Sequence, residues 1–225
     1  KQNYLLRNIF IVGIPRCGSS LVQAIIGRNE EVYEIGEAQI LRQSFMKLQK
    51  NTEEGINVSL EEIYKSKLKK NISCKKIVLD KLLFNYAFTP FIAAEFRGAK
   101  IIHCLRNRND NILSIYRANF GEINTYSSSI SDCIKLYDDH LKLMKIYMKE
   151  YSEMIYILDY DELVRDPKKE IKRLIRWLGF EWNTNYLKPN LNKSIINTTS
   201  NIQVRSPINS KSIGGWKNYP KIFGR

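Results

Sequence analysis

The sequence predicts an α/β fold in which helices cover both faces of a central, mostly parallel sheet as three layers, with extra helices. Two observations predict this fold class. Four short apolar runs, typical of buried strands, occur at residues 9–12, 77–79, 101–105 and 155–158, and segments with apolar residues at helical spacing separate them. Because strands that alternate with helices form parallel sheets covered on both faces, we expect this architecture.

Length and composition indicate one globular domain, residues 1–225, with 44% hydrophobic residues. No apolar run approaches the ~20 residues of a membrane span, and no signal-peptide pattern opens the chain. Four cysteines show no paired metal-ligand spacing, which favours a reducing compartment. We therefore expect no membrane span, no metal centre and a cytoplasmic location.

The net charge is +13, from 36 basic and 23 acidic residues. Such an excess favours an anionic ligand or partner, such as a doubly phosphorylated nucleotide, an acidic peptide or a sulfated glycan, although a solubility role is an open alternative. We expect no nucleic-acid partner, because the sequence carries no RNA-binding signature.

The first expected strand leads into the stretch IFIVGIPRCGSSLVQAII at residues 9–26. A turn with Gly13 and Gly18 follows the strand, and apolar residues at helical spacing follow the turn. The free N–H groups and the dipole at a helix N-terminus favour an anion there. Ser19 and Ser20 add hydrogen-bond donors and Arg16 adds a guanidinium, so the stretch predicts a phosphate or sulfate site. A loop that only caps the helix is the alternative.

The two glycines have the spacing of a Walker loop, but Ser19 stands where the Walker lysine belongs. That lysine normally contacts the phosphates of a nucleoside triphosphate. The sequence therefore disfavours a nucleotide kinase or NTPase, for which Asp80 is the only candidate Walker-B aspartate.

The remaining elements follow in order. A connection over residues 32–36 leads to a helix that starts near Glu37 and continues to about Lys50. Ser59 and Glu62 form a capping box that starts the helix over 59–70. Further helices are expected over 85–96, 110–120 and 131–151, the last strongly amphipathic. Asp166 and Pro167 start a helix that ends at Gly179, and residues 183–225 are mostly irregular.

A polar residue follows each of the four expected strands: Arg16, Lys81, Arg106 and Tyr160. Ligands of open parallel sheets bind beyond the carboxyl ends of the strands, so we expect these four side chains near one site. Ser114 lies eight residues after Arg106 on the following helix. A guanidinium and a hydroxyl at one sheet edge predict a second phosphate site.

The motif PRCGSSL is similar to the PRSGTT-type 5′-phosphosulfate loop of sulfotransferases that use 3′-phosphoadenosine 5′-phosphosulfate (PAPS). Arg106 and Ser114 resemble the RDPRD…S motif for the 3′-phosphate, with Asn107 and Asn109 as departures. The whole chain resembles this P-loop-like family, and within it the tyrosylprotein sulfotransferases and their bacterial relatives, often fused to tetratricopeptide repeats. The further blocks lie at residues 36–41, 79–86, 137–144, 160–167, 177–182 and 203–219.

The resemblance implies roles for individual residues. Glu37 would be the general base, and Lys81 and Ser200 would stabilise charge on the transferring and leaving groups together with Arg16. Tyr160 would contact the adenine, and residues 200–209 of the irregular C-terminal part would close over the nucleotide. The implied nucleotide contacts are Arg16, Cys17, Gly18, Ser19, Ser20, Arg106, Ser114, Tyr160, Gln203, Val204, Arg205, Lys211 and Lys217.

One departure concerns Gly215, which stands where relatives carry Lys or Arg before Trp216. Either Lys211 or Lys217 would replace that contact, or nucleotide affinity would be lower. The family implies PAPS as the sulfuryl donor without a metal, an acceptor hydroxyl on a tyrosine of an acidic peptide, a carbohydrate or a small molecule, and a homodimer. A degenerate, non-catalytic anion-binding protein is the alternative from another class.

His103 and His140 are expected in the core rather than in the site. Either histidine would be the base if Glu37 were too far from the acceptor.

Overall fold

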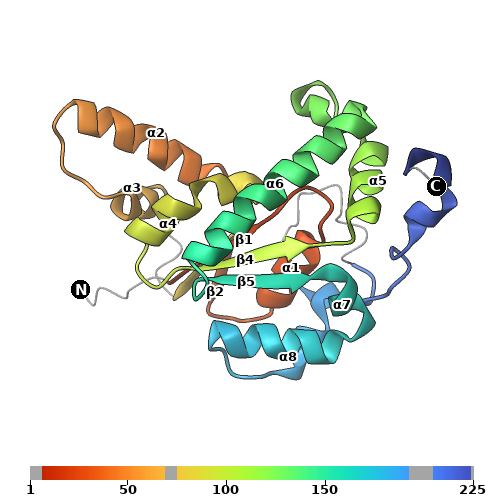
Figure 1. Ribbon diagram of the computed structural model, residues 1–225. Coiled ribbons are helices and arrows are strands. Elements are labelled where there is room, and N and C mark those ends of the chain that lie inside the picture. The colour runs from red at the N-terminus through yellow and green to blue at the C-terminus, as the bar shows by residue number, and fades with distance from the viewer. Residues whose placement is uncertain (1–6, 69–74, 193–204, 224–225) are drawn as a thin grey trace.

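The centre of the computed structural model, which describes residues 7–68, 75–192 and 205–223, is a five-stranded sheet in the order β2-β3-β1-β4-β5. All neighbouring strands pair in parallel, and the helices lie on both faces of the sheet (Figure 1). The predicted three-layer α/β class is confirmed. The strands are β1 (Arg7–Val12), β2 (Val32–Gly36), β3 (Ile77–Asp80), β4 (Lys100–Leu105) and β5 (Ile155–Asp159).

Alternating side chains of β1 serve two separate hydrophobic cores, as the period of a strand requires. Ile9 and Ile11 lie in the core that α1 (Ser19–Ile26), α7 (Tyr160–Arg165) and α8 (Pro167–Leu178) cover. Phe10 and Val12 lie in the core on the other face, against α2 (Ile40–Glu53), α3 (Leu60–Lys67), α4 (Thr89–Glu95) and α6 (Ile130–Glu150). Burial on both faces explains why the apolar run of β1 is continuous.

A third cluster lies beyond the carboxyl end of β1, where α5 (Arg108–Ala118) packs against α6. Ile14 of the loop after β1 contacts Ile112 and Ile115 of α5, and Cys133 and Tyr137 of α6 complete the cluster. This packing fixes α5 beside the loop after β1, which matters for the site because α5 carries Ser114.

The predicted helix signals are mostly confirmed. Ser59 and Glu62 form the capping box of α3. Asp166 accepts a hydrogen bond from the Lys169 N–H at the start of α8, and Gly179 ends the helix in the left-handed conformation. Short 3₁₀ segments occur at Leu83–Phe88, Glu122–Ser128, Thr184–Leu187, Pro189–Leu191, Gly215–Asn218 and Pro220–Ile222.

Three local predictions are wrong. Residues 32–36, predicted as a connection, form the edge strand β2, which half-buried and polar side chains obscured. The helix predicted to start near Glu37 starts at Ile40, with Gln39 at its N-cap, so Glu37 lies in the turn after β2. The short helix α7 was not predicted; Asp159 caps it directly at the end of β5.

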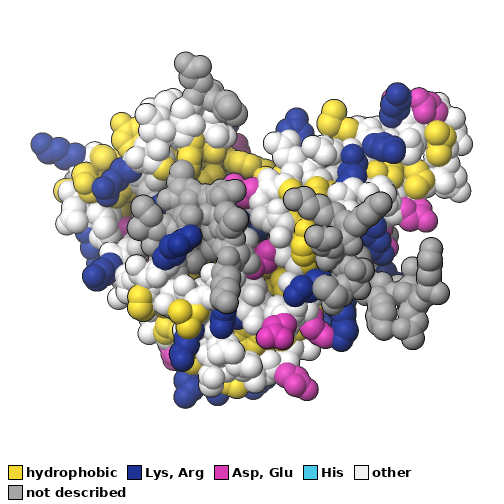
Figure 2. Space-filling view, turned by 180° about the vertical axis from the view of Figure 1, so that it is seen from behind, with side chains coloured by type: hydrophobic (Ala, Val, Ile, Leu, Met, Phe, Trp, Pro, Cys, Tyr) yellow, Lys and Arg dark blue, Asp and Glu magenta, His cyan; other side chains and the backbone are white. Residues whose placement is uncertain are grey.

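The described residues form no helix long and apolar enough to cross a bilayer. On the face seen in Figure 2, Lys and Arg side chains are scattered among Asp and Glu rather than gathered into one basic surface. The excess of positive charge therefore does not by itself mark a binding face there, and the site has to be found from its geometry.

Candidate functional site

The loop between β1 and α1 has an unusual backbone at three positions. Gly13 has φ 152°, and a Cβ there would lie 2.8 Å from the Cys104 carbonyl oxygen. Gly18 has φ 94°, and a Cβ there would lie 2.3 Å from the Tyr160 ring. Arg16 has φ 68°, a conformation that costs free energy for a residue with a side chain and that is concentrated at functional sites. Both glycines are therefore required by backbone conformation and by close packing.

The N-terminus of α1 faces this loop. Ser19 and Ser20, the first two residues of the helix, are buried, and no acidic residue lies in its first turn. The backbone N–H groups and the positive end of the helix dipole are thus combined with two hydroxyl groups, as an anion site requires.

Two guanidinium groups meet beside the loop, although 90 residues separate them in the chain. Arg16 Nε donates to Ser114 Oγ at 3.1 Å, and an Arg106 terminal nitrogen donates to the Arg16 carbonyl oxygen at 3.2 Å. Burial lowers the pKa of Arg16, and the charge of Arg106 lowers it further. Arg106 Nε is buried without a hydrogen-bond partner in the described part of the chain. An anion between these groups would relieve their repulsion.

These groups lie in a cavity of about 920 Å³, at the upper end of the range of ligand pockets (~300–1,000 Å³). The Arg106 guanidinium lies 5.1 Å from the centre of the Tyr160 ring. Of the residues predicted from the sequence, those lining the cavity are Arg16, Gly18, Ser19, Ser20, Arg106, Ser114, Tyr160 and Lys211. The structure therefore brings both predicted anion sites, from two different strand ends, into one cavity.

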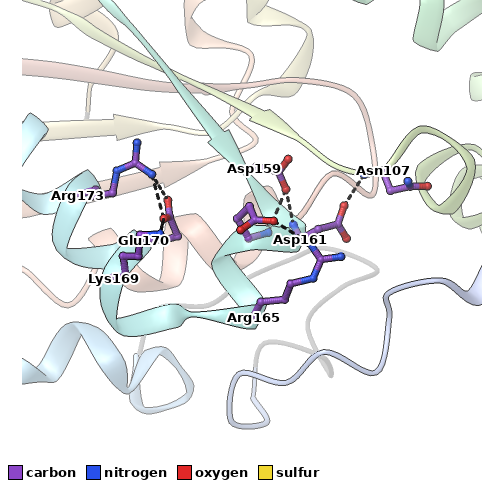
Figure 3. Close-up of polar contacts among 8 residues, drawn as sticks. Asn107, Asp159, Asp161, Arg165, Lys169, Glu170 and Arg173 are labelled. Carbon is purple, nitrogen blue, oxygen red and sulfur yellow. Dashed lines mark hydrogen bonds and ion pairs between the residues drawn. The ribbon is translucent and has the colours of Figure 1, made fainter.

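The turn after β4 is held to α7, the helix that follows the neighbouring strand β5. The Asn107 N–H donates to Asp161 Oδ2 at 2.6 Å, and Asp159 caps the helix α7 that carries Asp161 (Figure 3). Burial raises the pKa of Asp161. The Asn107 side chain accepts from the Asn109 and Asp110 N–H groups and so caps α5. The asparagine that departs from the RDPRD pattern thus has a structural role that fixes Arg106 at the cavity.

Lys81 and Glu37 form a separate pair at the ends of β3 and β2. Lys81 Nζ lies 2.5 Å from Glu37 Oε1, and the Lys81 N–H donates to the Gly36 carbonyl oxygen. The Lys81 side chain is 1% exposed and that of Glu37 is 45% exposed. Neither residue lines the 920 Å³ cavity. A buried cation and an accessible carboxylate are suited to stabilising charge and to moving a proton.

Asp80, directly before Lys81, is buried and accepts hydrogen bonds from three groups. Tyr64 Oη donates at 2.9 Å, Asn85 Nδ2 at 3.1 Å and the Leu82 N–H at 3.2 Å. Burial raises the pKa of Asp80 to about 7 in spite of these bonds. Asp80 therefore orders the turn that carries Lys81, and it does not line the cavity as a metal-binding Walker-B aspartate would.

This pKa predicts a pH dependence of stability. An unfolded Asp has a pKa of ~3.9, so between about pH 4 and 7 the native state binds more protons than the unfolded state, and stability falls as pH rises. The amide introduced by Asp80→Asn does not titrate. We therefore expect the free energy of unfolding of Asp80→Asn, measured relative to that of the unsubstituted protein, to rise by on the order of 2 kcal/mol from pH 5 to pH 8. Urea unfolding of both proteins at pH 5, 6 and 8 measures this; a difference that stays constant with pH contradicts it.

Cys17 and the two histidines do not form part of the cavity wall. Cys17 is buried and its thiol contacts that of Cys104, so only its backbone faces the loop. His103 Nε2 and His140 Nε2 lie 3.0 Å apart in the interior, and burial lowers their pKa values to about 3 and about 4. Both histidines are core residues, as predicted.

The C-terminal part of the site bears on the departure at Gly215. Lys211 lines the cavity, whereas Lys217 and Arg205 do not. Ser200, Gln203 and Val204 lie outside the described residues. Sequence reasoning missed Arg117 and Asp110, which also line the cavity. Arg117 lies one helical turn after Ser114, and this spacing could have indicated it.

Comparisons with known proteins identify the family of this chain. A family profile described as "Sulfotransferase family" matches residues 8–184. An uncharacterized protein of Aquifex aeolicus is 28% identical over 96% of the chain, and protein-tyrosine sulfotransferase 1 of Danio rerio is 22% identical over 92%. The chain spans only 31% and 65% of the lengths of these two relatives.

Solved structures share the fold. The sulfotransferase domain of the Synechococcus PCC 7002 olefin synthase has a TM-score of 0.69 and 16% identity, over 96% of this chain and 90% of that one. The mouse sulfotransferase SULT7A1 complexed with PAP has a TM-score of 0.64 and 16% identity, over 96% and 80% of the two chains. At such identities the likeness concerns the fold.

Proposed function

The chain belongs to the sulfotransferase family, and from this premise we propose that it transfers a sulfuryl group from PAPS to an acceptor hydroxyl. The single observation that supports PAPS most is the cavity in which two anion sites, from the ends of β1 and β4, meet beside the Tyr160 ring. A nucleotide that carries phosphate groups on both the 5′ and the 3′ positions of its ribose, together with a planar base, matches this arrangement.

The residues present fit such a nucleotide. The N-terminus of α1, with Ser19, Ser20 and Arg16, would hold the 5′-phosphosulfate, and Arg106 with Ser114 would hold the 3′-phosphate. Arg106 Nε, which has no hydrogen-bond partner among the described residues, and the repulsion between the two guanidinium groups both favour an anion there. Lys211 and Arg117 add positive charge to the wall.

PAPS, when bound, supplies an activated sulfuryl group, and its 5′-phosphate is the leaving group. The role of the protein is to hold both ends of the nucleotide and to stabilise the negative charge that grows on the departing phosphate oxygen. Fixed N–H donors and cations do this most effectively where water is excluded. We propose the N–H groups of α1, Arg16, Lys81 and Ser200 for this role, and no metal is needed for it.

We propose Glu37 as the general base that takes the proton of the acceptor hydroxyl. Its carboxylate is accessible and its position is fixed by Lys81. Contact with a buried cation holds the carboxylate in one place, and proton transfer by a positioned group contributes ~10²–10⁴-fold in rate.

The acceptor is proposed as a hydroxyl compound. A tyrosine of an acidic peptide agrees with the relatives named protein-tyrosine sulfotransferases and with the net charge of +13, and a carbohydrate or small molecule are the alternatives. A homodimer and a cytoplasmic location remain predictions.

Calorimetry with PAP and no magnesium tests the nucleotide assignment. We expect sub-millimolar binding, and we expect Arg106→Gln to weaken it about 10–100-fold, because a charge-assisted hydrogen bond is lost in a buried site. The matched control is Arg97→Gln, which replaces an exposed arginine in the turn after α4. Preference for ATP with magnesium would support a kinase instead, and PAP binding without transfer to any acceptor would support the non-catalytic alternative.

A further inference from the structure

We propose that Asp110 is a positioning residue: its carboxylate anchors the C-terminal strap (residues 206–216) on α5 and so builds one wall of the nucleotide cavity before the nucleotide binds. The identity of the nucleotide rests on the proposed function, whereas the anchor itself does not.

The carboxylate uses both of its oxygens on the backbone of the strap. The Gly214 N–H donates to Asp110 Oδ2 at 2.6 Å, and the Trp216 N–H donates to Asp110 Oδ1 at 3.0 Å. Asp110 is buried, with only 3% of its surface exposed. Hydrogen bonds to a carboxylate are about twice as strong as neutral ones, and these two join segments 104 and 106 residues apart in the chain.

The strap contributes much of the cavity wall. Residues 206–209, 211, 212 and 215 line the cavity together with residues of the loop after β1. An Arg106 terminal nitrogen donates to the Ser212 carbonyl oxygen at 2.6 Å. Gly214, with φ 75°, turns the chain so that its own N–H and that of Trp216 both reach Asp110 on α5. The strap and the helix Gly215–Asn218 stand beside α5 in Figure 1.

Asp110 lies in the first turn of α5, where the helix dipole favours a carboxylate, but it also lies in the wall of the cavity. A carboxylate in a cavity that contains Arg16, Arg106, Arg117 and Lys211 lowers the affinity for a phosphate group by direct repulsion. Its two hydrogen bonds to the strap explain why a carboxylate lies there. A wall that is already ordered removes the entropic cost of ordering a loop when the ligand binds.

Asp110→Asn separates the two effects by the sign of the change. The amide has nearly the same shape but only one acceptor oxygen, so one strap N–H would face an NH₂ group. If Asp110 is an anchor, the PAP affinity of the variant falls about tenfold or more, because the cavity wall is formed in only a fraction of the variant molecules. If Asp110 acts only through its charge, removing that charge raises the affinity, and this result would overturn the proposal.

Limited trypsin digestion without nucleotide tests the anchor independently. Lys211 and Lys217 lie on either side of the anchored turn, so we expect Asp110→Asn to accelerate cleavage there several-fold, while Asp132→Asn, an exposed carboxylate of α6, leaves it unchanged. Equal rates of cleavage in Asp110→Asn and the unsubstituted protein would contradict the proposal that Asp110 anchors the strap.

Gly214→Ala disturbs the same turn from the strap and leaves α5 intact, because its φ of 75° is unfavourable for alanine. We expect it to reproduce both the faster cleavage and the weaker PAP binding, with the KM for PAPS rising more than kcat falls. Failure of the unsubstituted protein to bind PAP would count against the proposed function, and the digestion would still decide whether Asp110 anchors the strap. Slow cleavage of Gly214→Ala together with unchanged PAP binding would contradict the role of the turn.

Discussion

Glu37→Gln is expected to lower turnover by about 10²–10⁴-fold while PAP binding stays nearly unchanged. The amide is close in shape to the carboxylate but cannot accept a proton from the acceptor hydroxyl. Glu37 does not line the 920 Å³ cavity that we propose for the nucleotide, so the affinity for PAP gives a separate measure that the change should not affect. A sulfuryl-transfer assay with labelled PAPS, together with calorimetry, measures both quantities.

Glu53→Gln, which neutralises an exposed carboxylate at the end of α2, is the control and should leave turnover unchanged. If Glu37→Gln transfers sulfuryl groups as fast as the unsubstituted chain, Glu37 is not the base. The buried, neutral His103 and His140 would be poor replacements, because burial lowers the pKa values of both imidazoles.

Lys81→Met is expected to lower turnover by about 10²–10³-fold, the size of effect seen when one fixed donor to a developing charge is removed. Lys81 is 1% exposed, so its charge acts where water screens it little. Methionine keeps most of the apolar stem, and Glu37, at 45% exposure, can be hydrated once its partner is gone. The fold should therefore persist, which circular dichroism checks.

The matched control is Lys47→Met on α2, whose side chain is exposed. A loss of turnover equal to that of the control would remove Lys81 from the mechanism. Lys81→Arg keeps the charge but places a larger, planar group in a buried site, so we expect only partial recovery.

The double variant Glu37→Gln/Lys81→Met tests whether the pair works as a unit. The two groups lie 2.5 Å apart, so their effects should not be additive in free energy, and the double variant should lose less activity than the product of the two single losses. Multiplicative losses would mean that the contact between the two side chains is unimportant for turnover.

Much of the architecture could be predicted from local patterns. The apolar run of β1 predicts burial on both faces, and the structure shows two cores on its two sides. The capping signals of α3 and α8 were sufficient because a cap involves residues only three positions apart. The edge strand β2 could not be recognised in this way, because its half-buried side chains give no clear period.

The two anion motifs were also visible in the sequence, since each combines a strand end, a basic residue and hydroxyl groups within a short stretch. The contact of Arg16 with Ser114 was not visible, nor was the approach of Arg106 to the Arg16 carbonyl group. The two motifs meet because β1 and β4 are neighbours in the sheet.

The sequence by itself determined the fold class and most of the helices and strands, and it predicted the two stretches that we propose as anion sites, because hydrophobic period, caps and glycine turns act over a few residues. Only the tertiary structure decided that Lys81 pairs with Glu37, that Arg106 reaches Arg16, and that Asp110 holds a strap 104 residues further along. Such contacts depend on the order of the strands and on which loop packs over which helix end, and these are properties of the whole packed chain rather than of any segment.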